Sequence, residues 1–172
     1  MRTDFTLLSL LIFAFVMAAA VLLLVIGNKS FEISDDLYVS WLILLAVMIA
    51  YIVLHELVHG LVYKIFTGEK LTFGLSWSCA FCGVPKIFTY RRTALYAVSA
   101  PLILFTLIFI PVLAAAYYFS SVYFMLSSII FGLHLGGCIG DMYIMYLFLF
   151  KYKNKNALMN DTGPVMTLYI PE

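Results

Sequence analysis

A series of long apolar runs constrains this chain more than any other feature. The first run, residues 5–27, holds no charged side chain, and about 20 such residues cross the hydrocarbon core of a bilayer as a helix. We expect further membrane helices over residues 39–66, 96–119 and 122–150. Hydrophobic residues make up 65% of the 172 residues, against about 45–50% in soluble domains. The sequence therefore predicts an all-α polytopic membrane protein with about four transmembrane helices.

The length of the chain indicates one membrane-embedded domain over residues 1–172. A secretory signal peptide is a competing interpretation of the first run, because the small residues Ala18–Ala20 could form a cleavage site. The run continues past them for longer than the core of a signal peptide, so we expect a retained helix. The net charge is only +1 and the charges are not concentrated in a patch, so they give no reason to expect nucleic acid as a partner.

The loop between the second and third runs, residues 67–93, differs from the rest in its periodicity. Bulky apolar side chains alternate with small ones from Leu71 to Phe81. A period of two predicts a strand or a small β-hairpin. Pro85 is expected to end the strand or to open a turn.

The tail, residues 151–172, and the distribution of basic residues predict an orientation. In the tail, NDTGP at 160–164 indicates a turn and VMTLYI at 165–170 a short strand. In a four-helix arrangement one side of the membrane receives all basic residues but Lys29, namely Arg2, Lys64, Lys70, Lys86, Arg91, Arg92, Lys151, Lys153 and Lys155. The positive-inside rule then places both termini and the strand loop in the cytoplasm. The charge pattern does not separate an endoplasmic-reticulum membrane from a bacterial one; we expect a prokaryotic plasma membrane.

The second apolar run contains the ionisable pattern HELVH at residues 55–59. On a helix, His55 and His59 lie one turn apart on the same face, and Glu56 flanks them. Two imidazoles in this arrangement can bind one Zn²⁺ while the carboxylate reaches a bound water. A polar contact between helices is the alternative. Because each ionisable residue at the bilayer centre costs at least ~2.5 kcal/mol, three close together favour zinc.

A third ligand is expected from the fourth run, which contains His134 and Asp141. Asp141 lies about 15 Å from the cytoplasmic end of its helix, close to the depth of about 14 Å for His55. We therefore predict His55, His59 and Asp141 as the zinc ligands, with water in the fourth position. His134 is the alternative ligand. It could also orient substrate or stabilise an oxyanion, or be a hydrogen-bonded packing residue.

The cysteines and the glycines of the sequence lead to two further predictions. The cysteines Cys79, Cys82 and Cys138 are expected to be reduced thiols, because their number is odd and no small disulfide framework fits them. The CAFC segment lacks the second cysteine pair of a metal site and the thioredoxin-like context of a redox motif. Glycines recur every fourth residue at Gly132, Gly136 and Gly140. This spacing predicts that the helix backbone approaches a neighbouring helix closely.

Together these motifs resemble one membrane family. HELVHG, the GD pair at 140–141, the strand loop leading into SAPLI, and the tail from NDTG to LYIP are similar to a zincin peptidase family, long catalogued as a domain of unknown function and related to the site-2 proteases. The resemblance implies that His55 and His59 bind zinc, that Glu56 is catalytic and that Asp141 is the acidic third ligand. Family members commonly carry asparagine where this chain has His134. The segment HLGGCIGDM also departs from the proline-containing motif and DG pair of the site-2 proteases.

The preferred hypothesis is an intramembrane zinc metalloendopeptidase acting on a membrane-protein or peptide substrate within the lipid bilayer. The alternative is a non-catalytic zinc-binding membrane scaffold or regulatory protein. Glu56 favours the enzyme, because a purely structural zinc site does not need an acid beside its histidines. A transporter is the least favoured hypothesis, because the buried polar residues are confined to two of the predicted helices.

Overall fold

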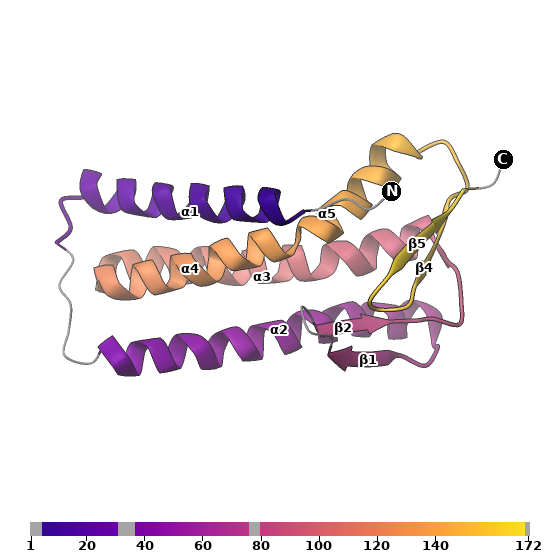
Figure 1. Cartoon of the computed structure of the whole chain (residues 1–172), viewed down its shortest axis with the longest axis horizontal. Coiled ribbons are helices and arrows are strands. Elements are labelled where there is room, and N and C mark those ends of the chain that lie inside the picture. The colour runs from indigo at the N-terminus through magenta and orange to yellow at the C-terminus, as the bar shows by residue number, and fades with distance from the viewer. Residues whose placement is uncertain (1–4, 31–36, 76–79, 171–172) are drawn as a thin grey trace. The chain divides into compact units, whose positions relative to one another are not determined.

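Five α-helices and five short strands form the described part of the chain, residues 5–30, 37–75 and 80–170 of a computed structural model (Figure 1). The helices are α1 Thr6–Ile26, α2 Leu37–Thr67, α3 Arg91–Phe119, α4 Ser121–Gly137 and α5 Ile139–Tyr146, and a π-helix, Leu147–Lys151, follows α5. The strands are β1 Thr72–Leu75, β2 Ala80–Gly83, β3 Thr89–Tyr90, β4 Leu158–Asp161 and β5 Met166–Tyr169.

Four helical segments among the described residues are long and apolar enough to cross a membrane: Thr6–Ile26, Tyr38–Thr67, Arg91–Phe119 and Ser121–Lys151. Many of their large apolar side chains are exposed, including Phe15, Ile43 and Leu107. A soluble protein would bury much of this surface to gain about 25 cal/mol per Å². The prediction of a mostly helical chain with four membrane-length helices is therefore confirmed, and the chain is compatible with a membrane protein.

The predicted fourth helix, residues 122–150, is present as one membrane-length helical segment, Ser121–Lys151, but it is not one continuous α-helix. α4 begins after Ser120, whose hydroxyl accepts a hydrogen bond from the Val122 N–H, and it ends at Gly137. The tandem glycines Gly136 and Gly137 precede the interruption at Cys138, and glycine destabilises a helix by about 1 kcal/mol relative to alanine. Helical structure resumes as α5 and finishes in the π-helix.

The third predicted helix, residues 96–119, begins too late. α3 already starts at Arg91, because its first turns carry Ala94, Ala97 and Val98 into a buried core. The Arg91 guanidinium also donates a hydrogen bond of 2.6 Å to the carbonyl oxygen of Lys153.

The predicted strand over Leu71–Phe81 is a hairpin of two strands. β1 and β2 pair antiparallel, with Phe73 opposite Cys82 and Leu75 opposite Ala80. Residues 76–79, which include Trp77 and Cys79, lie outside the described residues. β2 ends at Gly83, and Pro85 lies in the turn that follows, as predicted. The prediction of a β-hairpin between the second and third helices is thus confirmed.

The tail forms a second sheet, with strand order β3-β4-β5 and antiparallel pairing. The predicted strand at 165–170 corresponds to β5. The predicted turn at 160–164 begins too early, because Asn160 and Asp161 are still paired within β4. The short strands β3 and β4 were not predicted, since neither has an alternating pattern long enough to indicate a strand.

The chain packs as two compact units. Unit 1 comprises Met1–Met48 and Leu102–Gly140, and unit 2 comprises Ile49–Pro101 and Asp141–Glu172. The core of unit 2 is formed by Tyr63, Val84, Ala94, Ala97, Val98, Ile144, Leu147, Phe148, Ala157 and Met159. The single domain over 1–172 stays a prediction.

Within unit 1, α1 and α4 lie side by side (Figure 1). A Cβ at Gly136 would lie 3.2 Å from the Ser9 carbonyl oxygen, and one at Gly132 would lie 2.9 Å from the Phe13 ring. The Ser9 hydroxyl donates a 2.8 Å hydrogen bond to the carbonyl oxygen of Gly136. Close helix approach through the glycines is therefore confirmed for these two positions, whereas a Cβ at Gly140 would meet nothing within 4 Å.

Candidate metal centre

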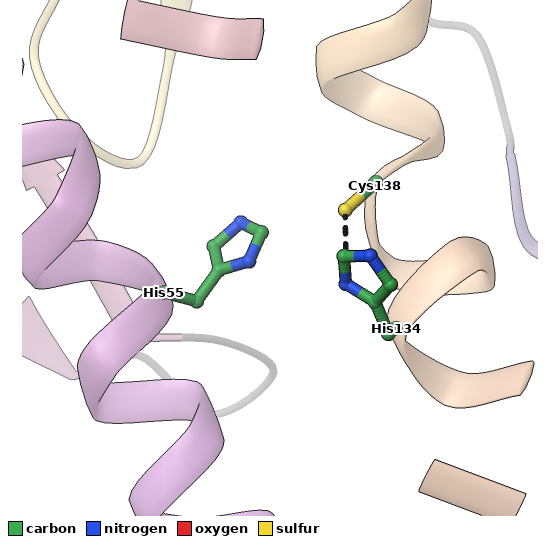
Figure 2. Close-up of side chains that lie close together, drawn as sticks. All are labelled: His55, His134 and Cys138. Carbon is green, nitrogen blue, oxygen red and sulfur yellow. Dashed lines mark hydrogen bonds between the residues drawn. The ribbon is translucent and has the colours of Figure 1, made fainter. Parts of the chain in front are cut away.

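α2 brings the two histidines of the HELVH pattern together within unit 2. His55, which projects from the side of α2 (Figure 2), and His59 are separated by one helical turn. Their Nε2 atoms are 3.2 Å apart, and their rings meet edge to face at 73°. His59 is only 6% exposed. The predicted shared face is thus present, with both Nε2 atoms directed to one point.

Asp141 supplies the third group of this cluster. It lies in the first turn of α5 and is 6% exposed. Its Oδ2 atom lies 3.5 Å from His55 Nε2 and 3.4 Å from His59 Nε2. The structure therefore brings together the three residues that the sequence analysis selected as metal ligands, and the group could hold a metal ion.

The spacing of the three atoms fits zinc. The pairwise distances are 3.2, 3.4 and 3.5 Å. A tetrahedral Zn²⁺ with bonds of 2.0–2.1 Å separates its ligand atoms by ~3.3–3.4 Å. Two imidazole nitrogens and one carboxylate oxygen are also the donor set of many catalytic zinc sites, which keep a fourth position for water.

The hydrogen bonds on the far side of each imidazole also suit metal binding. His59 Nδ1 lies 2.8 Å from the Ala97 carbonyl oxygen. A carbonyl oxygen can only accept, so Nδ1 carries the proton and the Nε2 lone pair is available. His55 Nδ1 lies 3.0 Å from the Tyr51 hydroxyl, whose oxygen can accept a hydrogen bond from an Nδ1–H in the same way. Sequence reasoning missed both partners, although Tyr51 stands one helical turn before His55.

Glu56 follows the first histidine and is half-buried. The backbone N–H of Cys82, in β2, hydrogen-bonds to its carboxylate. A carboxylate has two oxygens that can accept about four hydrogen bonds, so this bond leaves capacity for a water molecule. The catalytic role of Glu56 stays a prediction.

His134 belongs to unit 1, where it is completely buried. Its Nε2 atom lies 3.0 Å from the Thr106 hydroxyl, and its Nδ1 atom lies 3.6 Å from Cys138 Sγ (Figure 2). Three aromatic rings contact its imidazole, those of Phe105, Phe109 and Phe131. These contacts match the hydrogen-bonded packing residue that was one of the alternatives, and a role of His134 toward substrate stays a prediction.

Two of the three cysteines lie among the described residues. Cys82 and Cys138 are both buried, reduced thiols, whereas Cys79 lies outside the described residues. Burial, together with the nearby carboxylates of Glu56 and Asp161, raises the pKa of Cys82 to about 12. Its thiol is therefore almost fully protonated at neutral pH and unreactive.

Comparison with known protein families shows to which family this chain belongs. The family described as "Putative zincin peptidase" matches residues 48–157. The chain belongs to this family. Neither the curated proteins nor the solved structures provide a match.

Membership of the zincin peptidase family supports a zinc metallopeptidase. The matched range contains the complete cluster, since His55, Glu56, His59 and Asp141 all fall within it. The match ends at residue 157, before the strand β4 and its buried Asp161. The assignment of the metal ligands stays a prediction.

Proposed function

We propose that this chain is an intramembrane zinc endopeptidase with His55, His59 and Asp141 as the metal ligands and Glu56 as the general base. The observation that carries the proposal is the triangle of Nε2, Nε2 and Oδ2 atoms, whose edges of 3.2–3.5 Å fit tetrahedral zinc. Family membership gives independent support for peptidase activity.

In the proposed hydrolysis each group of the site has a separate role. Bound zinc supplies a Lewis acid for the scissile carbonyl and lowers the pKa of a water molecule. Glu56 takes the proton of the attacking water on a carboxylate oxygen and passes it to the leaving amine. Ala97 and Tyr51 hold the two imidazoles so that their Nε2 atoms stay directed at the metal.

The proposed substrate is a membrane protein or peptide, and the β1–β2 hairpin is the proposed capture surface. Leu75 and Phe73 of β1 are 82% and 49% exposed, and β1 pairs on one side only, with β2, in the described sheet. A substrate segment must unwind to present a peptide bond, and an extended segment can pair with a strand edge. The hairpin contacts α2 at Gly60, one residue after His59, which supports a capture surface close to the cluster.

We further propose that the loop 67–93 and both termini face the cytoplasm of a prokaryotic plasma membrane. The support is the placement of the basic residues around the apolar spans. Reporter fusions after Lys70 and after Lys155 should both indicate the cytoplasmic side. A periplasmic signal from either fusion contradicts this orientation.

Glu56→Gln tests the enzyme hypothesis. The amide keeps the shape of the side chain but cannot accept the proton of water, so cleavage of membrane-helix substrates in liposomes should fall by about 10²–10⁴-fold. Zinc content should stay at the wild-type level. Glu69→Gln, the same change outside α2, is the matched control and should cleave normally.

Cleavage by Glu56→Gln at the wild-type rate would contradict the mechanism. If the zinc-loaded wild type cleaves no member of a broad substrate panel, the non-catalytic zinc-binding scaffold replaces the enzyme as the function.

A further inference from the structure

One face of α2 is held by the β1–β2 hairpin and the tail. Glu56, Gly60 and Tyr63 stand at positions i, i+4 and i+7, so they lie on the same face of the helix. Glu56 is bonded by the Cys82 N–H. A Cβ at Gly60 would lie 2.8 Å from the Phe73 ring and 2.9 Å from Cys82 Sγ. Because residue 60 is glycine, the Phe73 and Cys82 side chains of the hairpin pack directly against the backbone of α2.

Tyr63 continues this face into the tail. It is completely buried, and its hydroxyl donates a 2.7 Å hydrogen bond to Asp161 Oδ2. Asp161 is 1% exposed. Its Oδ1 atom accepts a 2.8 Å hydrogen bond from the Gly163 N–H. Both carboxylate oxygens thus accept a hydrogen bond, one from Tyr63 of α2 and one from the turn of the tail.

The main chain of Asp161 holds the end of the hairpin. Its carbonyl oxygen accepts a 2.8 Å hydrogen bond from the Val84 N–H, two residues after the Cys82 N–H that bonds Glu56. A Cβ at Gly83 would lie 2.7 Å from the same carbonyl oxygen and would also clash with the Gly163 nitrogen. Asp161 therefore joins three parts of unit 2: α2 through Tyr63, the end of β2 through the following residue Val84, and its own turn.

Attachment of the tail does not require this carboxylate. The neighbouring Asn160 side chain donates to the carbonyl oxygens of Pro85 and Ile87, at 3.1 and 2.7 Å. The Thr89 hydroxyl donates to the Met159 carbonyl oxygen at 3.0 Å. A buried carboxylate carries a desolvation cost that an amide or an apolar residue would not. What distinguishes Asp161 from its neighbours is the direct bond to the helix that carries His59 and Glu56.

We propose that Asp161 is a positioning residue: through Tyr63 and Val84 it fixes β2 against α2, so that the Cys82 N–H keeps the Glu56 carboxylate oriented. The inference rests on the proposed function, because it assigns Asp161 a task in the reaction of Glu56. It also makes a prediction about the resting protein that needs neither zinc nor substrate. If the Tyr63–Asp161 bond is lost, β2 should separate from α2 more often.

The Cys82 thiol reports this separation directly. It is buried against α2, and its pKa of about 12 keeps it unreactive. We would measure alkylation of Cys82 by a maleimide at pH 8 in metal-free full-length protein, with the label located by mass spectrometry. Tyr63→Phe and Asp161→Asn should each raise the alkylation rate by about tenfold or more.

Thr89→Val is the matched control, since it also deletes one buried hydroxyl that donates to the tail. It should lower the melting temperature by an amount comparable to Tyr63→Phe, while Cys82 alkylation stays at the wild-type rate. Equal alkylation rates in Tyr63→Phe and Thr89→Val would overturn the inference on their own.

The second arm measures cleavage with zinc bound. Tyr63→Phe and Asp161→Asn should keep the wild-type metal content and KM but lose about 10–100-fold in kcat, the scale expected when a reacting group is misplaced, whereas Thr89→Val should keep its kcat. Faster Cys82 alkylation with unchanged kcat would make Asp161 a purely structural residue and overturn the inference. If the wild type binds no zinc and cleaves nothing, the proposed function fails, and the alkylation arm alone decides whether Asp161 holds β2 against α2.

Discussion

The two units use buried histidines in opposite ways. In unit 1, both ring nitrogens of His134 lie near polar side chains, those of Thr106 and Cys138, and aromatic rings surround the imidazole. In unit 2, the outer nitrogens of His55 and His59 have partners in Tyr51 and Ala97, while both Nε2 atoms face the Asp141 carboxylate. A histidine whose partners are already supplied stabilises packing. Two histidines that direct their remaining nitrogens at one carboxylate form a site for a cation.

The same contrast holds for glycine. In unit 1, Gly132 and Gly136 allow α4 to approach α1, and the outcome is helix packing. In unit 2, Gly60 lets a hairpin reach the helix that carries the metal cluster. The types of residue are therefore the same in both units. What distinguishes the metal cluster of unit 2 is that its hydrogen-bonding atoms point toward one another.

The largest expected effect separates Asp141 from His134. Asp141→Ala removes one of three zinc ligands and should lose most of the bound zinc, because the remaining pair of histidines cannot complete the tetrahedron. His134→Ala should keep about one zinc per chain. Zinc in the purified variants can be measured by mass spectrometry of the elements. Retention in Asp141→Ala together with loss in His134→Ala would reverse the roles that we assign to the two units.

A smaller loss of zinc affinity is expected from Tyr51→Phe. The change leaves all three proposed ligands in place but removes the hydroxyl that lies 3.0 Å from His55 Nδ1. Loss of such a partner typically costs 10–100-fold in metal affinity, about 1.4–2.7 kcal/mol. Competition with a zinc chelator measures it. Tyr38→Phe, an exposed tyrosine on the same helix, is the control, and equal affinities in the two variants would argue against this contact.

Gly136→Val tests unit 1 alone. The new side chain would press against the Ser9 backbone, and overpacking of this kind costs about 1–3 kcal/mol. Gly137→Val is the matched control, since a Cβ there meets nothing within 4 Å. Denaturant unfolding in detergent should show a lower stability for Gly136→Val only, with zinc content unchanged in both. Equal stabilities would mean that α4 does not rely on this approach.

The smallest expected effect is a pH dependence that arises in the tail. Burial raises the pKa of Asp161, although the hydrogen bonds from Tyr63 and Gly163 act in the opposite direction. The folded state then binds this proton more tightly than the unfolded state. Its contribution to stability is complete below the unfolded pKa of about 3.9 and is lost as pH rises through the folded pKa. Each unit of the raised pKa corresponds to about 1.4 kcal/mol.

Comparison with Asp161→Asn isolates that contribution, because the amide does not titrate. Melting temperatures measured from about pH 4 to pH 7 should fall more in the wild type than in Asp161→Asn. Parallel profiles of the two proteins would contradict a raised pKa at Asp161.

Much of this molecule could be predicted from short-range patterns. The spans followed from apolar runs of bilayer length, and the pairing of His55 with His59 followed from the 3.6-residue period of a helix. Asp141 was found because few ionisable residues occur in the apolar runs, so each needs a partner. The hairpin followed from the two-residue alternation around Phe73.

The remaining features depend on contacts between segments that are far apart in the chain. The interruption at Cys138 and the π-helix lie inside a run whose mean hydropathy is high enough for one membrane span, so hydropathy gave no sign of them. The composition of NDTGP predicts a turn that includes Asp161. Asp161 instead pairs within the β4–β5 sheet, and its bond to Tyr63 connects residues 98 positions apart. The Ala97 carbonyl that orients His59 has no sequence signal at all, since any residue supplies a backbone oxygen.

The most direct test of the central claim is zinc K-edge X-ray absorption on the purified wild-type protein, with the zinc content measured on the same sample. The account predicts about one zinc per chain, two imidazole ligands, and all remaining scattering from oxygen or nitrogen near 2.0–2.1 Å. Asp141→Ala should lose this spectrum, and His134→Ala should retain it. A sulfur shell near 2.3 Å, a third imidazole, or a protein that holds no zinc would contradict the assignment of His55, His59 and Asp141 as the metal site.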